Sequence, residues 1–308
     1  MPKTPHGASR ADDRTWADRL LAVAGGEAPD VAATRVDDFR RFLVLYGAVR
    51  SWLWLPLAPD SSGLLAPLAL CHTVAAAMVF VPRGAEWAAR GALAVVLGQV
   101  VWSFPLAANH LYLELVCLVL VALPRPGDAR DAAAALSGLR WTAALVLFHT
   151  GLQKVFYGAY FRGDFLALMA GADERFGRAF RFVLPGAELE RLAGLDRSRT
   201  GAGPFRVDSP IFVVASNAVW IAELCLPVLL LSRRGRVWGA LGGVGLMVGI
   251  QVVALEIGFA LLFVNLLLLF LPGRWNARAL PFTLVIFVWA LGAAAGWLPG
   301  QPVDWNLL

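Results

Sequence analysis

The chain has 308 residues, of which 58% are hydrophobic and only 16% are charged. Soluble domains carry about 25% charged residues, so the composition excludes an ordinary soluble globular protein. The net charge is +5, but the basic residues lie mostly between apolar segments. That placement is typical of topology signals and lipid contacts and argues against a nucleic-acid-binding protein. We therefore predict an all-α, polytopic integral membrane protein surrounded by membrane lipids, with no nucleic-acid partner.

The N-terminal residues 1–38 are polar and mixed in charge. They contain no signal peptide, so we expect the first membrane helix to stay in the mature protein. Within them, residues 11–24 have the pattern of a short amphipathic helix. The three cysteines lie inside apolar segments and form no CxxC motif, so small buried side chains are the simplest interpretation.

Nine apolar segments follow, at residues 42–57, 64–82, 88–103, 107–123, 139–157, 210–231, 237–255, 258–272 and 280–298. A membrane-spanning helix needs roughly 20 apolar residues, and several of these segments are shorter. Residues 258–272 follow the preceding segment with almost no loop. We therefore predict a transmembrane domain over residues 39–298 with eight or nine helices, followed by a tail at 299–308.

The distribution of arginine predicts the orientation of the chain. Alternate short loops carry arginine, as in the pair Arg233 and Arg234, whereas the loops near 58–63 and 104–107 have no basic residue. Because basic loops stay in the cytoplasm, we expect a cytoplasmic N-terminus and a multi-pass protein of the cell inner (plasma) membrane. The long segment 158–209 is then exoplasmic. Its patterns predict an amphipathic helix at 165–183 and a second helix at 187–194, which together form a lid.

The membrane segments contain an unusual set of polar residues. Each ionisable residue there costs about 2.5–3.5 kcal/mol, so such residues generally face an interior and serve a purpose. The ionisable residues are Arg50, His72, His110, Glu114, His149, Lys154, Glu223 and Glu256, and the neutral polar residues are Asn109, Gln153, Asn217 and Gln251. The predicted topology places most of the ionisable groups toward the exoplasmic side. We therefore expect one polar cavity that opens to that side or lies beneath the lid.

Each of these residues also has a purely structural interpretation. Arg50 and Lys154 are long enough to extend toward headgroups, and a lone histidine is commonly a hydrogen-bonded packing residue. Glu223 suits a helix-pairing ion pair, and Glu256 suits a solvated helix end. His110 and Glu114 are harder to explain structurally, because they lie one turn apart on one helix face. The histidines lack HxxxH or ExxH spacing, so no metal site is predicted.

Two stretches resemble a known family. They are AANHLYLELVCLVLVALP, with Asn109 and His110, and FHTGLQKVFYGAYFRGDFL, with Gly151, Lys154 and Gly163 in order. Both resemble the HTTM membrane domain, which is the domain of the vitamin K-dependent γ-glutamyl carboxylases. The resemblance extends to FRRFLVLYG, IAELCLPVLLLSRRGRVWG and IGFALLFVNLLLLFLP, and it covers most of residues 36–272.

The resemblance implies a specific chemistry. In the carboxylases, the lysine matched by Lys154 acts as the base that deprotonates vitamin K hydroquinone, beside the pair matched by Asn109 and His110. It therefore implies catalytic roles for these three residues and a reduced quinone as cofactor. We expect the polar residues nearby to contact the substrate, namely Glu114, His149, Gln153, Glu223, Gln251 and Arg50. A lysine in an apolar pocket can act as a neutral base, and histidine can move a proton.

The chain also departs from the carboxylase pattern. Those enzymes carry a large exoplasmic domain after the membrane part, whereas this chain ends at Leu308, which leaves a separate exoplasmic protein as a candidate partner. Val248 occupies the place of a histidine typical of the family. The leading hypothesis is therefore a carboxylase-like or oxidoreductase membrane enzyme acting on a quinol or other lipid-soluble substrate. Two alternatives remain: a non-catalytic accessory or assembly protein, and a proton-coupled transporter, which would need access from both membrane sides.

Overall fold

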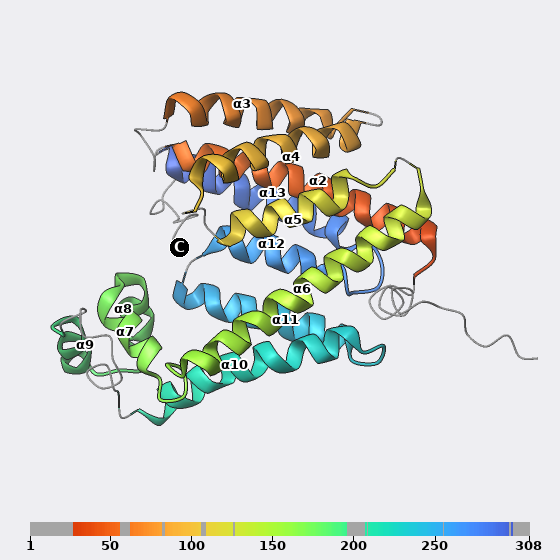
Figure 1. Cartoon of the computed structure of the whole chain (residues 1–308). Helices are drawn as coiled ribbons and strands as arrows, with labels where there is room; N and C mark the ends of the chain where they lie inside the picture. Colours follow the sequence, from red (N-terminus) through yellow and green to blue (C-terminus); the bar gives the residue numbers. More distant parts are fainter. Residues whose placement is uncertain are drawn as a thin grey trace, which may run out of the picture.

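The computed structural model describes residues 27–55, 62–81, 84–105, 109–125, 127–195, 209–254 and 256–295, with the single residues 207 and 297. Over this part of the chain the protein has twelve helices and no strand (Figure 1). The all-α prediction is therefore confirmed. The helix predicted at 11–24 and the tail at 299–308 lie outside the described residues.

The helices and their bounds are α2 (Pro29–Trp54), α3 (Ser62–Met78), α4 (Gly84–Ser103), α5 (Asn109–Ala122), α6 (Ala129–Tyr157), α7 (Asp164–Ala172), α8 (Glu174–Phe180), α9 (Gly186–Ala193), α10 (Pro210–Leu231), α11 (Arg236–Ala254), α12 (Ile257–Leu268) and α13 (Trp275–Ala294). Each predicted apolar segment forms one helix. The largest error is in α2, which begins at Pro29, well before the apolar run that starts at Phe42.

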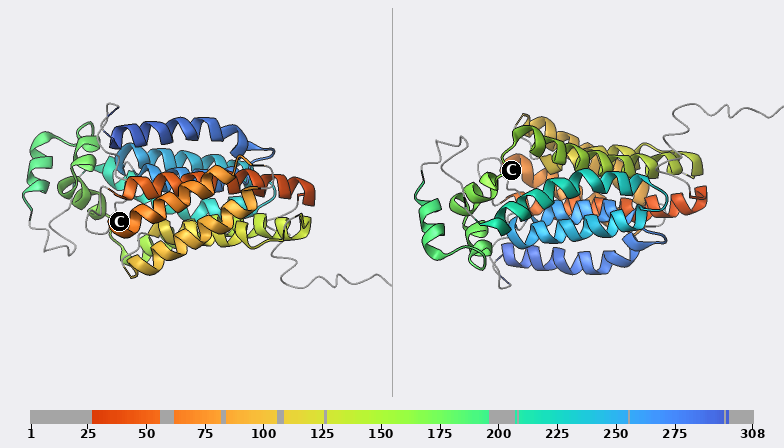
Figure 2. Two further views of the ribbon diagram at one scale, coloured as in Figure 1. Left: turned by 90° about the horizontal axis from the view of Figure 1, so that it is seen from above. Right: turned by 90° about the horizontal axis from the view of Figure 1, so that it is seen from below.

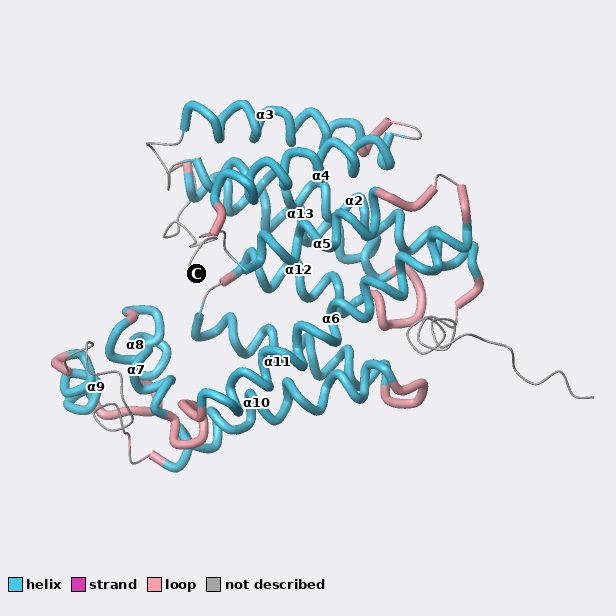
Figure 3. Tube along the Cα trace, viewed as in Figure 1, coloured by secondary structure: helices cyan, strands magenta, loops and turns pink. Residues whose placement is uncertain are grey.

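Nine of these helices form a bundle, and the other three lie beyond one of its ends. The bundle helices follow one another up and down along a common direction, so that their connections gather at the two ends (Figures 1 and 3). The views from above and below place α7, α8 and α9 past the same end in both cases (Figure 2). Helix α2 lies at the centre, where Phe39, Phe42 and Leu43 are fully buried.

Four helices are long and apolar enough to cross a membrane: α6, α10, α11 and α13. Three shorter apolar stretches lie at Leu65–Met78, Asn109–Ala122 and Ile257–Leu268. Large apolar side chains such as Phe80, Val101 and Trp102 are mostly exposed on the outside of the bundle. A chain with this surface and these helices has the character of a membrane protein.

Buried arginines hold the ends of the short helices at the end of the bundle opposite α7–α9. The guanidinium of Arg35 donates to the carbonyls of Leu268, Leu269 and Leu271, just at and after the C-terminus of α12. The guanidinium of Arg140 donates to the Leu269 carbonyl at 2.6–2.8 Å. The last carbonyls of a helix have no partner within the helix. A cation at this end also interacts favourably with the negative end of the helix dipole. These arginines therefore serve as C-terminal caps.

Further polar contacts complete this end of the bundle. Arg40 donates to the carbonyl of Val121, and Arg90 donates to the carbonyl of Ala122, which closes α5 in the same way. The carboxylate of Glu27 pairs with the guanidinium groups of both Arg35 and Arg140. These four arginines thus have a structural task inside the fold.

The predicted helix at 165–183 is wrong in one respect, because it forms two helices instead of one. The break falls at Asp173, which has an extended backbone and whose carboxylate accepts from the Arg175 backbone N–H. The Arg175 guanidinium also pairs with this carboxylate at 2.6 Å, and that hydrogen bond holds the pKa of Asp173 below its usual value. The second predicted helix, at 187–194, corresponds to α9. A small separate core joins the three helices to α10 through Phe212.

We predict that Arg140→Gln lowers the unfolding free energy by about 1–3 kcal/mol, because the Leu269 carbonyl and the Glu27 carboxylate each lose one of their two guanidinium partners. Thermal unfolding in detergent measures the effect. The matched control is Arg41→Gln, since Arg41 is half exposed and pairs with Asp37 one turn away on α2. Equal melting temperatures for the two variants would contradict the capping role.

Candidate functional site

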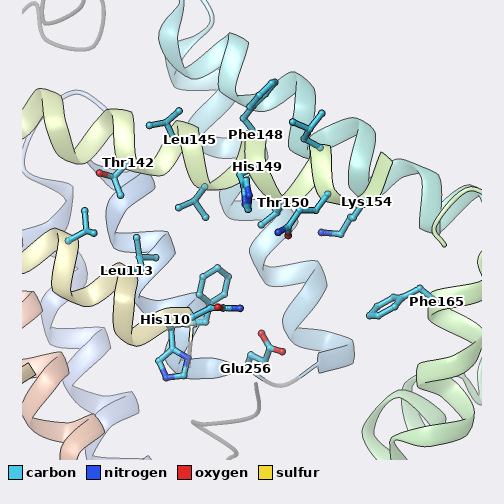
Figure 4. A pocket seen from close by; sticks show the side chains of 16 residues that line it. His110, Leu113, Thr142, Leu145, Phe148, His149, Thr150, Lys154, Phe165 and Glu256 are labelled. Carbon is cyan, nitrogen blue, oxygen red and sulfur yellow. The ribbon is translucent and has the colours of Figure 1, made fainter. Parts of the chain in front are cut away.

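A cavity of about 990 Å³ lies between α5 and α6 and extends to the start of α7 and the turn between α11 and α12 (Figure 4). Its polar lining consists of Asn109, His110, Thr142, His149, Thr150, Gln153, Lys154 and Glu256. All three residues to which the family resemblance assigns catalysis therefore line one cavity.

Two helix ends supply most of these polar side chains. Asn109 and His110 form the first residues of α5, and His149, Gln153 and Lys154 lie in the last turns of α6. Consecutive helices that run in opposite directions bring the start of one beside the end of the other. Helix α6 ends at Tyr157 and is capped by Gly158, whose φ of 67° suits glycine, and the chain then turns toward α7.

The remainder of the cavity is apolar and opens on the side of the bundle. Leu113 and Val116 line it from α5, and Leu145 and Phe148 line it from α6. Val116, Leu145 and Phe148 keep 46–57% of their surface exposed, so this wall is not closed over by other helices. The lining of α6 runs from Thr142 to Lys154, which is about 18 Å of helix. The cavity is thus amphiphilic, with a polar end near α7 and an apolar side opening.

Lys154 is held at the polar end by a carboxylate from α10. Its Nζ lies 2.8 Å from both oxygens of Glu223, and it also lies 5.2 Å from the ring centroid of Tyr160. The close approach of α10 depends on Gly151, because a Cβ there would stand 3.0 Å from the Cβ of Glu223. The chain has only one other lysine, Lys3.

A second polar group lies apart from the cavity, between α2, α3, α4 and α5. Nε of Arg50 donates to Glu114 at 2.6 Å, and its Nη2 donates to Gln99 at 2.6 Å. Gln99 donates in turn to Ser51, whose hydroxyl lies 3.1 Å from Nδ1 of His72. Arg50 and Glu114 have no exposed side-chain surface. The prediction of a single polar cavity is therefore wrong, because the ion pair of Arg50 and Glu114 is sealed inside the bundle.

Glycine makes this second group possible. A Cβ at Gly47 would stand 2.5 Å from an oxygen of Glu114 and 2.3–2.6 Å from the ring of His72. Among the described residues, Oε1 of Glu114 and Nε2 of His72 have no hydrogen-bond partner, and the same holds for Nη1 of Arg50. A glycine on α2 thus brings an imidazole and a carboxylate close together beside a buried guanidinium.

The structure divides the predicted site residues among four places. Asn109, His110, His149, Gln153 and Lys154 line the cavity. Glu223 lies behind Lys154, whereas Glu114 and Arg50 belong to the sealed group. Gln251 is not among the lining residues, and its amide nitrogen and oxygen are buried with no partner in the described part of the chain.

Glu256 lines the cavity. Its position at the end of an apolar segment is also typical of a solvated helix end, which is the structural interpretation from the sequence. The signal that bears on its position is the close succession of the segments at 237–255 and 258–272. So short a connection places Glu256 between the two helices, directly before the first residue of α12. The aromatic residues Phe165 and Phe259 also line the cavity and were not among the predicted site residues.

The described residues contain no group of three or more histidine, cysteine, aspartate or glutamate side chains arranged to hold a metal ion. Comparison with known proteins gives no match to a family model, to a curated protein or to a solved structure. The resemblance to the HTTM domain therefore stays a prediction from the sequence.

We predict that Arg50→Met destabilises the protein by about 3–5 kcal/mol, because Glu114 is then left as a buried carboxylate without its cation. The double variant Arg50→Met/Glu114→Met should be more stable than Arg50→Met alone, since the isolated charge is removed. Thermal unfolding of the wild type, both single variants and the double variant measures the coupling. Strictly additive effects would show that the two side chains do not stabilise each other.

Proposed function

We propose that the chain crosses the membrane nine times, with the N-terminus in the cytoplasm and α7–α9 as an exoplasmic lid. The up-and-down course of the nine bundle helices supports this, as does the collection of Arg35, Arg40, Arg90 and Arg140 at the end away from α7–α9. Helices α5 and α12 are short for a full crossing, and arginine side chains reach their C-termini. This orientation fits a multi-pass protein of the cell inner (plasma) membrane.

This topology has a direct test by cysteine labelling in a background in which all three cysteines are replaced by serine or alanine. A membrane-impermeant maleimide should label Glu190→Cys on α9 in intact cells. The same reagent should label Arg234→Cys, between α10 and α11, only after the membrane is opened. Labelling of both positions in intact cells would contradict the proposed orientation.

We further propose that the cavity is the active site of a membrane enzyme acting on a quinol or another lipid-soluble substrate with an acidic hydroxyl. The observation that carries this proposal is the convergence of Asn109, His110 and Lys154 on one cavity. These are the residues that the HTTM resemblance singles out from the sequence, and they come from two different helices. The proposal includes a relationship to the membrane domain of the vitamin K-dependent carboxylases.

The shape of the cavity supports an amphiphilic substrate. A polar head group fits among Lys154, His110 and Asn109, and an apolar tail fits along the wall formed by Leu145 and Phe148. Because this wall opens on the side of the bundle, a substrate dissolved in the bilayer would enter without crossing water. A reduced prenylated quinone has this division into a ring with hydroxyl groups and an apolar tail. Such a molecule would be held by these residues, and it would supply the reducing equivalents.

Lys154 is the proposed base, and the carboxylate of Glu223 is the proposed acceptor of the lysine's ammonium proton. Two opposite charges in an apolar site are costly, so moving the ammonium proton to the carboxylate yields a neutral amine beside a neutral acid. The amine of Lys154 then accepts the proton of the substrate hydroxyl, which leaves a substrate oxyanion beside the new ammonium group. His110 and Asn109 hydrogen-bond the oxygen from α5 and fix its position.

The decisive experiment combines purification with mass spectrometry. The wild-type protein, isolated in lipid nanodiscs, should carry a lipid with a hydroxylated ring, identified after solvent extraction. Leu145→Trp should reduce the bound amount about tenfold by filling the apolar wall, whereas Leu241→Trp on the exposed face of α11 is the matched control. Lys154→Met should still bind the lipid but convert it at least about 100-fold more slowly than the wild type.

The outcomes separate the alternatives. An extract with no specific lipid, from the wild type and both tryptophan variants alike, would favour a non-catalytic accessory protein. Turnover equal to the wild type in Lys154→Met would remove the lysine from the mechanism. Uptake of a labelled solute into vesicles that depends on a proton gradient would indicate a transporter.

A further inference from the structure

The cavity contains a second carboxylate that the proposed base mechanism does not use. Glu256 lies in the turn between α11 and α12, immediately before Ile257, and its side chain lines the cavity. Figure 4 shows the side chains of Glu256 and Lys154 pointing into the same space from different elements. The head-group end therefore has an acidic group on one side and the lysine on another.

The carboxylate of Glu256 forms no ion pair with the described residues. No hydrogen bond or ion pair connects its carboxylate to another residue in the described part of the chain, although the backbone carbonyl of Glu256 accepts from Ala260. Burial raises the pKa of the Glu256 carboxyl, and the positive charge of Arg175 on α8 opposes that rise. The guanidinium of Arg175 itself pairs with Asp173 at 2.6 Å. The carboxylate oxygens thus remain available to a ligand.

The other polar groups of the lining do not fix the hydrogen-bonding role of a ligand. The amides of Asn109 and Gln153 and the imidazole of His110 can each donate or accept, and Lys154 can donate to a hydroxyl or to a carbonyl. An ionised carboxylate only accepts. Among these groups, Glu256 in its ionised form is therefore the one that requires a donor on the ligand.

We propose that Glu256 accepts a hydrogen bond from a second hydroxyl of the ligand head group, and that it makes the cavity select the reduced, dihydroxy form of a quinone over the oxidised, dicarbonyl form. This inference rests on the proposed function and names a specificity residue for it. A hydroxyl directed at Glu256 forms a charge-assisted hydrogen bond. A carbonyl oxygen in the same place faces the carboxylate without a proton between them, so the oxidised form binds with a penalty.

The test compares two probes that differ only in oxidation state. They are a naphthoquinone with one short prenyl tail and its hydroquinone, titrated without oxygen into the full-length protein in nanodiscs, with tryptophan fluorescence as the readout. We expect the wild type to bind the hydroquinone about 10- to 100-fold more tightly than the quinone. Glu256→Gln should bring this ratio close to one, because a glutamine amide can donate to a carbonyl. Glu256→Asp keeps the acceptor and should keep the preference.

Controls make the result specific. Glu190→Gln, on the exposed side of α9, removes one carboxylate far from the lining and should leave the ratio unchanged. If Glu256→Gln unfolds at a much lower temperature than the wild type, Glu256→Thr gives the same comparison, since a hydroxyl donates as well as accepts. A ratio that stays at the wild-type value in these variants would overturn the role of Glu256 and leave the proposed function standing. Failure of the wild type to bind either probe would overturn both.

Discussion

The fold depends on one constraint: a polar group inside an apolar bundle must find its partner within the protein. It is most evident at the C-terminus of α12, where Arg35 and Arg140 donate to the carbonyls around Leu269. Water or headgroups would satisfy such carbonyls at an exposed helix end, but Leu269 is fully buried. Because the arginines come from α2 and α6, capping one helix also joins three helices together.

The same constraint has two different results at the other end of the bundle. Arg50 and Glu114 are sealed from both solvent and cavity, and their hydrogen bonds extend through Gln99 to α3, so this pair connects helices. Lys154 and Glu223 form an ion pair of similar length, 2.8 Å against 2.6 Å, but the lysine borders a cavity that a ligand can enter. Access to a ligand, more than the strength of the pair, separates a structural ion pair from a candidate reactive one.

Much of the architecture could be predicted because it depends on local composition. Apolar runs indicate nine helices, and the bounds of α10 agree with the predicted 210–231. The start of α2 could not be predicted in this way, since its first half carries Arg35, Asp38 and Arg40, which become buried only through contacts with distant helices. The break between α7 and α8 depends on the capping carboxylate of Asp173, which competes with the amphipathic pattern that favours one helix.

The sequence by itself determined the helical class, the segments long and apolar enough to cross a membrane, and the set of polar residues placed within them, because each follows from hydropathy over a short window. Only the tertiary structure decided how those polar residues are shared. It placed Lys154, His110 and Glu256 in the lining of one cavity and buried Arg50 outside that cavity. The physical reason is that pairing and burial depend on which faces of which helices meet, and glycines such as Gly47 and Gly151 set those approaches across residues far apart in the chain.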